Sequence, residues 1–129
     1  MKQIFLAAVL IIMPVAAFTG YNVVTAPATA ATNGLGDLSS FKTIIADVQA
    51  KAGSGDLKAA AARITDWESA WDQGETAIRP LNPVYWGNVD AASDAALAAL
   101  RAKQPSADAV KKTLASLMAV LNDPSQPAP

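Results

Sequence analysis

The feature that most constrains the fold is an apolar stripe between residues 57 and 78. Apolar or small side chains recur there at alternating three- and four-residue spacing: Leu57, Ala60, Ile64, Trp67, Trp71, Gly74 and Ile78. This spacing puts them on one face of an α-helix. Asp56 is a suitable N-cap, and Arg79-Pro80 ends the pattern because proline disfavours helix in the residue before it. The stripe therefore predicts one long helix.

Three more stretches have the same kind of spacing and their own start and stop residues. The first ends at Gly53, the second begins at Asn82-Pro83 and stops near Gln104-Pro105, and the third begins at Ser106 and stops before Asn122-Asp123-Pro124. Their stripes are Leu38, Phe41, Ile44, Ile45 and Val48, then Trp86, Val89, Ala96 and Leu100, then Val110, Leu114, Leu117 and Leu121. No stretch alternates as a strand would. We therefore predict an all-α fold, a small antiparallel bundle of three to four helices over residues 38–122.

The first thirty residues have the pattern of a targeting segment. Lys2 precedes the apolar run Ile4–Phe18, and Ala28-Thr29-Ala30 fits the small-x-small site of a signal peptidase. We expect a signal peptide, residues 1–30, cleaved after Ala30. The alternative is a membrane anchor that spans Ile4–Ala26, in which case the chain contacts the membrane only through residues 1–26. Both alternatives export the rest of the chain, to the periplasm or to the periplasmic side of the inner membrane.

Composition limits the chemistry that the exported part can perform. The 129 residues contain no cysteine and no histidine, and the formal net charge is −1. These values exclude disulfides, thiol chemistry and histidine-based catalysis, and they leave no basic surface for nucleic acid. We expect no cofactor and no enzymatic activity. Residues 31–37 should be a flexible lead-in, and residues 123–129 a disordered tail.

Aromatic side chains gather around the connection between the second and third predicted helices. They are Trp67, Trp71, Tyr85 and Trp86, with Arg79 near enough for guanidinium stacking. Such a set is a candidate ligand or partner surface, because tryptophan, tyrosine and arginine concentrate binding energy at interfaces. The alternative is core packing, since Trp67 and Trp71 lie in register with the apolar stripe.

An acidic face on the predicted helix over 57–78 is a second candidate. Glu68, Asp72 and Glu75 lie four and three residues apart, so their carboxylates share one face and could bind a hard cation such as calcium. Asp90 and Asp94 form a further pair on the next helix. Carboxylate-bridged metal sites in bundles also use Glu-x-x-His motifs, which a chain without histidine does not have. A solvated face with a Glu75 to Arg79 ion pair is the alternative to a metal site.

Residues 34–121 resemble an uncharacterised family of small exported bacterial α-helical proteins. The resemblance rests on GLGDLSSFKTIIADVQA, GDLKAAAARITDWESAWDQGETAIRP and WGNVDAASDAALAALRA. Members of that family often carry a histidine where this chain has Gly87 and a cysteine near Ala109 or Val110. The resemblance implies export and a helical fold, and it implies no activity.

Together these features predict an exported, non-enzymatic helical domain that acts by protein–protein interaction in the cell envelope. The alternative is a periplasmic domain that binds a small ligand or a cation. It would use the aromatic residues around the helical hairpin or the acidic face of the second predicted helix.

Overall fold

The computed structural model describes residues 34–129, and within this range the chain is all-α with no strand. The expected signal or anchor segment, residues 1–30, lies outside the described residues. Four α-helices follow one another in the described range, with a short 3₁₀ turn after the second of them: α2 (Ser39–Gly53), α3 (Leu57–Ile78), η1 (Arg79–Leu81), α4 (Pro83–Leu100) and α5 (Ala107–Asn122). Among the described helices, none is both long and apolar enough to span a membrane.

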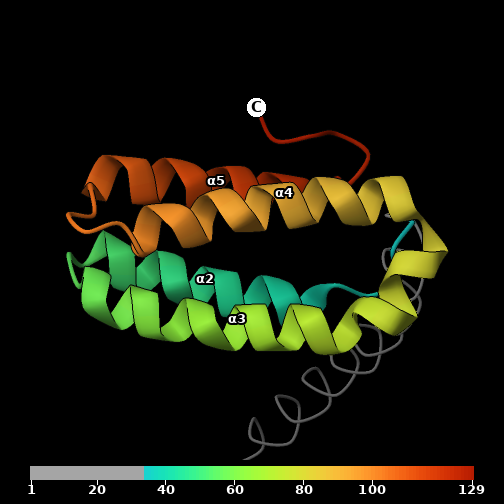
Figure 1. Cartoon of the computed structure of the whole chain (residues 1–129), viewed down its shortest axis with the longest axis horizontal. Coiled ribbons are helices and arrows are strands. Elements are labelled where there is room, and N and C mark those ends of the chain that lie inside the picture. The colour runs from blue at the N-terminus through green and yellow to red at the C-terminus, as the bar shows by residue number, and fades with distance from the viewer. Residues whose placement is uncertain (1–33) are drawn as a thin grey trace, which may run out of the picture. The chain divides into compact units, whose positions relative to one another are not determined.

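The helices form an antiparallel bundle in which neighbours in the chain are neighbours in space. Helices α2 and α3 make one hairpin and α4 and α5 a second, and the two hairpins stack as layers (Figure 1). Helix α2 also packs against α5, and α3 against α4, which closes the ring of four. The predicted helical bundle is confirmed.

Side chains predicted to cap the helices do so. Asp56 accepts a hydrogen bond from the backbone N–H of Ala59 at the start of α3, and Asn82 accepts one from Tyr85 at the start of α4. Ser106 caps α5 in the same way. These bonds satisfy backbone donors that have no partner inside the helix. The expected end of the third predicted helix, near Gln104-Pro105, is wrong: α4 ends at Leu100, and residues 101–109 are exposed.

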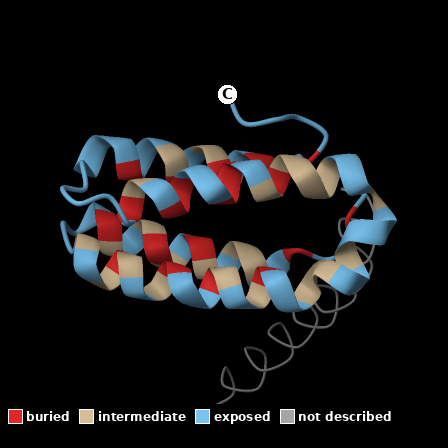
Figure 2. Cartoon of the chain, in the orientation of Figure 1, coloured by how far each residue is buried: buried red, intermediate tan, exposed pale blue. Residues whose placement is uncertain are grey.

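The core lies between the two hairpins, where the buried faces of all four helices meet (Figure 2). Helix α5 supplies mostly branched aliphatic side chains, and α4 supplies several small ones, including Ala92, Ser93 and Ala96. Trp67 and Trp71 of α3 are almost completely buried. Large indoles from α3 therefore fill the space that the small residues of α4 leave open, which gives this seam an interior-like packing.

Both ends of the described chain are held against the bundle. Leu35, in the expected flexible lead-in, is 1% exposed and belongs to the core. Beyond α5, Pro124 is buried and its carbonyl oxygen accepts a hydrogen bond from the Asn88 side chain. Leu35 and Pro124 are thus buried within segments that the sequence predicted to be flexible or disordered, while residues 125–129 are exposed.

Candidate functional site

Three indole rings and one guanidinium form a row along the seam between α3 and α4. Trp67 and Trp71 stack with centroids 5.3 Å apart, and Trp71 stacks on Trp86 at 5.9 Å. The Arg79 guanidinium lies 5.0 Å from the Trp86 ring centroid, at the outer end of the row. Phe41 of α2 meets Trp67 and Trp71 edge-on, at 5.8 and 5.3 Å. Such stacked and edge-on aromatic pairs stabilise a fold by more than the burial of their apolar area alone.

The three indole N–H groups have different surroundings. Trp67 Nε1 donates to Ser93 Oγ at 2.6 Å, and Ser93 is itself buried. Trp71 Nε1 and Trp86 Nε1 are also buried, but neither makes a hydrogen bond of normal geometry with the described residues. An unpaired buried donor costs free energy. Hydrogen bonding of the indole N–H groups is therefore most complete at the inner end of the row, at Trp67.

The predicted aromatic site divides into a buried part and a partly exposed part. Trp67 and Trp71 are 0% and 2% exposed, so the expectation that they belong to a ligand or partner surface is corrected: they are core. Tyr85 and Trp86 are half-buried, and Arg79 is exposed. Only the outer members of the predicted set can reach another molecule.

Two exposed apolar side chains lie beside these outer members, and the sequence analysis missed both. Leu81 is 59% exposed and Val84 is 70% exposed. They lie in the segment Arg79–Trp86, which we call the tip; it comprises η1, Asn82 and the first turn of α4, and it contains Pro80 and Pro83. Neither belongs to a helical stripe: Val84 is two residues before Trp86. The sequence does carry one signal of their exposure: each is an apolar residue that follows a proline and lies outside the apolar stripes of the helices.

The lead-in packs against the tip. Gly34 has a positive φ of 80°, and a Cβ placed on it would come within 2.9 Å of the Tyr85 ring. A Cβ on Gly36 would lie 3.8 Å from Leu81. Glycine at position 34 lets the backbone approach Tyr85 closely, and both glycines adopt a positive φ that other residues rarely adopt. The first described residues and the tip therefore share one end of the bundle (Figure 1).

The proposed acidic face does not assemble into a metal site. Glu68 makes two bonds to Arg101, at 3.0 and 3.1 Å, and this pairing lowers the pKa of Glu68. Glu75 pairs with Arg79 at 2.8 Å, as the i,i+4 alternative predicted, and Asp72 is exposed. Within residues 34–129, no group of three or more acidic side chains is arranged to hold a metal ion.

Asp90 is the described carboxyl whose pKa is raised. Partial burial is the largest cause, followed by the negative charge of Asp94, and Glu75 and Asp72 across the seam add to the rise. An interaction with the Trp71 side chain partly offsets it. Carboxylates of α3 and α4 are thus close enough to repel one another across this side of the seam.

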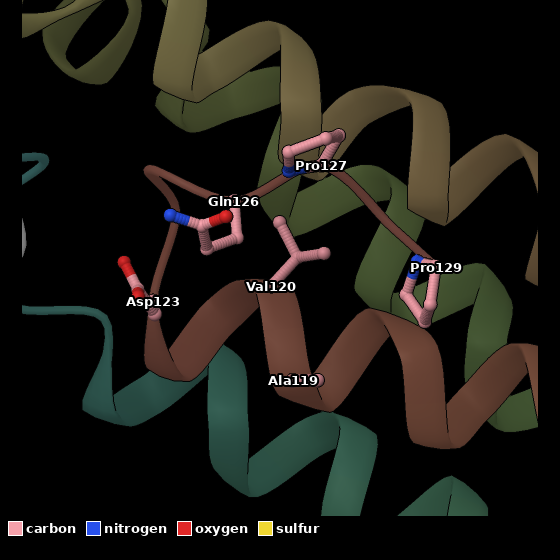
Figure 3. A pocket seen from close by; sticks show the side chains of 6 residues that line it. All are labelled: Ala119, Val120, Asp123, Gln126, Pro127 and Pro129. Atoms are coloured by element: carbon pink, nitrogen blue, oxygen red, sulfur yellow. The ribbon is translucent and has the colours of Figure 1, made fainter.

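Three hollows lie away from the aromatic row. The first, about 310 Å³, lies between the end of α5 and the tail (Figure 3). Ala119 and Val120 line it from the helix, and Gln126, Pro127 and Pro129 from the tail. Two others, of about 230 and 240 Å³, contain Lys111 and Lys112 respectively. Each of the three carries a single charged side chain, which is too few converging groups for acid–base catalysis.

Comparisons with family models, curated proteins and solved structures give no match to this chain. The resemblance to small exported bacterial helical proteins thus remains an expectation from the sequence.

Proposed function

We propose that the chain is an exported, non-enzymatic helical domain that acts by contact with another protein of the cell envelope. The contact surface is the tip, residues 79–86. The exposed side chains of Leu81 and Val84 carry this proposal, because they are the large apolar side chains left exposed in the described part of the chain. Exposed apolar groups beside half-buried aromatics are typical of protein interaction sites.

Neighbouring residues support the choice of the tip. Tyr85 and Trp86 are half-buried and partly accessible, and Arg79 stacks on Trp86. Arginine, tyrosine and tryptophan are the residues that most often dominate binding energy at interfaces. The tip begins with the 3₁₀ turn Arg79–Leu81, which contains Pro80, and Pro83 is the first residue of α4. The two prolines restrict the backbone of the tip, so little conformational entropy is lost on binding.

Export is supported by the sequence pattern of residues 1–30. Intact mass after cell fractionation tests it. A soluble periplasmic protein whose mass begins at Ala31 means a free periplasmic domain, and a full-length mass in the membrane fraction means an inner-membrane anchor. A full-length mass in the cytoplasmic fraction would contradict export.

Site-specific photo-crosslinking in cells tests the contact surface. A photoreactive phenylalanine analogue replaces Val84 in the full-length chain, and a matched variant carries it at Ala98, an exposed position of α4 far from the tip. We expect a discrete adduct with an envelope protein from position 84 and none from position 98. Equal labelling at both positions, or no adduct at position 84, would contradict the proposal.

A further inference from the structure

We propose that the partner segment that docks on the tip is basic as well as apolar: a polypeptide whose lysine or arginine side chains flank one or two apolar anchors. This inference rests on the proposed function and specifies the chemistry of the partner. It is carried by the exposed pair Leu81 and Val84 together with the distribution of charge along the bundle.

Charge is divided unevenly between the two ends of the bundle. The end with the tip comprises residues 34–44, 70–94 and 119–129, and it carries six acidic and two basic side chains. The remaining described residues, 45–69 and 95–118, carry five acidic and seven basic side chains. The tip end therefore has a formal charge of −4 and the other end +2, although the chain as a whole is nearly neutral.

The acidic side chains of α3 and α4 at the tip end of the bundle are largely without basic partners. Glu75 pairs with Arg79, while Asp72 and Asp94 are exposed and make no ion pair within the described residues. The charges of Asp94, Glu75 and Asp72 each raise the pKa of Asp90. Carboxylates around an apolar contact attract a partner of opposite charge and reject partners of like charge.

The same charge disfavours two other occupants of the tip. An anionic membrane surface would repel an end with a charge of −4. In a symmetric dimer the same patch meets itself, which would bring two such ends together. A basic polypeptide segment complements both the apolar pair and the carboxylates at the same end of the bundle.

Removal of the Arg79 side chain should increase the affinity for a basic segment, although loss of an interface arginine usually weakens binding. The Arg79 guanidinium covers the outer face of Trp86 and neutralises Glu75. A lysine or arginine of the partner would compete for the same indole face and the same carboxylate. Replacing Arg79 with glutamine should therefore strengthen the binding of a basic segment, whereas removal of an arginine that itself contacts an acidic partner would weaken it.

A pair of synthetic peptides tests the inference on the protein purified from cells that produce the full-length chain. One fluorescein-labelled amphipathic peptide contains leucine and lysine, and its control has glutamate in place of lysine. By fluorescence anisotropy at low salt, we expect the lysine peptide to bind at least about tenfold more tightly than the glutamate peptide. Leu81→Ser with Val84→Ser should weaken the lysine peptide by about tenfold or more, and Ala98→Ser with Ala102→Ser should leave it unchanged.

Charge variants complete the test. Asp72→Asn with Asp94→Asn should weaken the lysine peptide by about three- to tenfold, whereas Asp66→Asn with Asp108→Asn, an equal change of charge at the other end, should have a much smaller effect. Arg79→Gln should tighten binding by about two- to fivefold.

Several outcomes would overturn the inference, and they separate it from the proposed function. Equal binding of both peptides at the tip would contradict a basic partner, but the tip would remain a contact surface. Binding of phosphatidylglycerol vesicles that Leu81→Ser with Val84→Ser abolishes would make lipid the occupant, and self-association that the same variant abolishes would make it a second copy. Peptide binding that does not depend on Leu81 and Val84 would also overturn the inference. The crosslink at position 84 would then decide whether the proposed function survives.

Discussion

The two ends of the indole row show how one residue type takes different parts in the same structure. At the inner end, Trp67 is fully buried, and its N–H donates to Ser93. At the outer end, Trp86 is half-buried, its N–H has no partner of normal geometry among the described residues, and its face is covered by an exposed arginine. The rings stack along the whole row, while their burial and the hydrogen bonding of their N–H groups decrease toward the tip.

The decline follows from what lies opposite each ring. Ser93 belongs to the small-residue face of α4, against which the Trp67 ring fits closely. At the outer end, α3 stops at Ile78 because Pro80 follows, and the 3₁₀ turn directs Leu81 away from the core. The inner end therefore stabilises the fold, and the outer end has side chains free for contact.

Alanine substitution at the two ends should separate them most clearly. Trp67→Ala should lower the free energy of unfolding by about 3–5 kcal/mol, because it leaves a large cavity and an unpaired Ser93. Trp86→Ala should cost less, about 1–2 kcal/mol, because Trp86 is only partly buried. Denaturant unfolding of both variants measures the difference. Equal losses would mean that the outer end is as much a part of the core as the inner one.

The hydrogen bond at the inner end should have a smaller but measurable effect. Ser93→Ala leaves the Trp67 N–H buried without an acceptor and should cost about 1–3 kcal/mol. Ser69→Ala, on the exposed face of α3, is the matched control and should change stability by less than about 0.5 kcal/mol. The two variants gain similar helix propensity, so their difference isolates the buried bond. The same loss of stability in both variants would show that Ser93 only fills space.

The carboxylates on the outer part of the seam predict a pH effect of definite sign. The pKa of Asp90 is raised in the fold above its ordinary value of 3.8, so the folded state binds this proton more tightly than the unfolded state. Its contribution to stability is present below that value and is lost as pH rises through the folded pKa. Asp90→Asn should therefore increase the free energy of unfolding near neutral pH, by less than the change in Ser93→Ala. This gain in the free energy of unfolding should decrease toward about pH 3. Urea unfolding near neutral pH and near pH 3 would measure it. A variant that is less stable at neutral pH would contradict this interpretation.

Much of the fold could be predicted because its signals are local. The caps Asp56, Asn82 and Ser106 and the proline at position 80 mark helix ends within a few residues of sequence. The four-residue spacing of Trp67 and Trp71 puts both in the apolar stripe, so their burial follows from the pattern that favoured core packing.

The remaining features depend on contacts between distant residues. The bond between Trp67 and Ser93 spans 26 positions, and that between Glu68 and Arg101 spans 33. Leu35 lies between two glycines, a composition typical of a mobile segment, yet its side chain is buried in the core. The exposure of Leu81 and Val84 depends on which helices surround the connection, and helical spacing does not specify that.

Unfolding of the variant Leu81→Ser with Val84→Ser tests the central claim most directly, because the claim is that the tip serves contact while the interior of the row serves stability. Both side chains are more than half exposed, so their loss should change the free energy of unfolding by no more than about 0.5 kcal/mol per residue. A loss near that of Trp67→Ala would mean that the tip is a structural part of the bundle. It would then not be the free surface on which the proposed function depends.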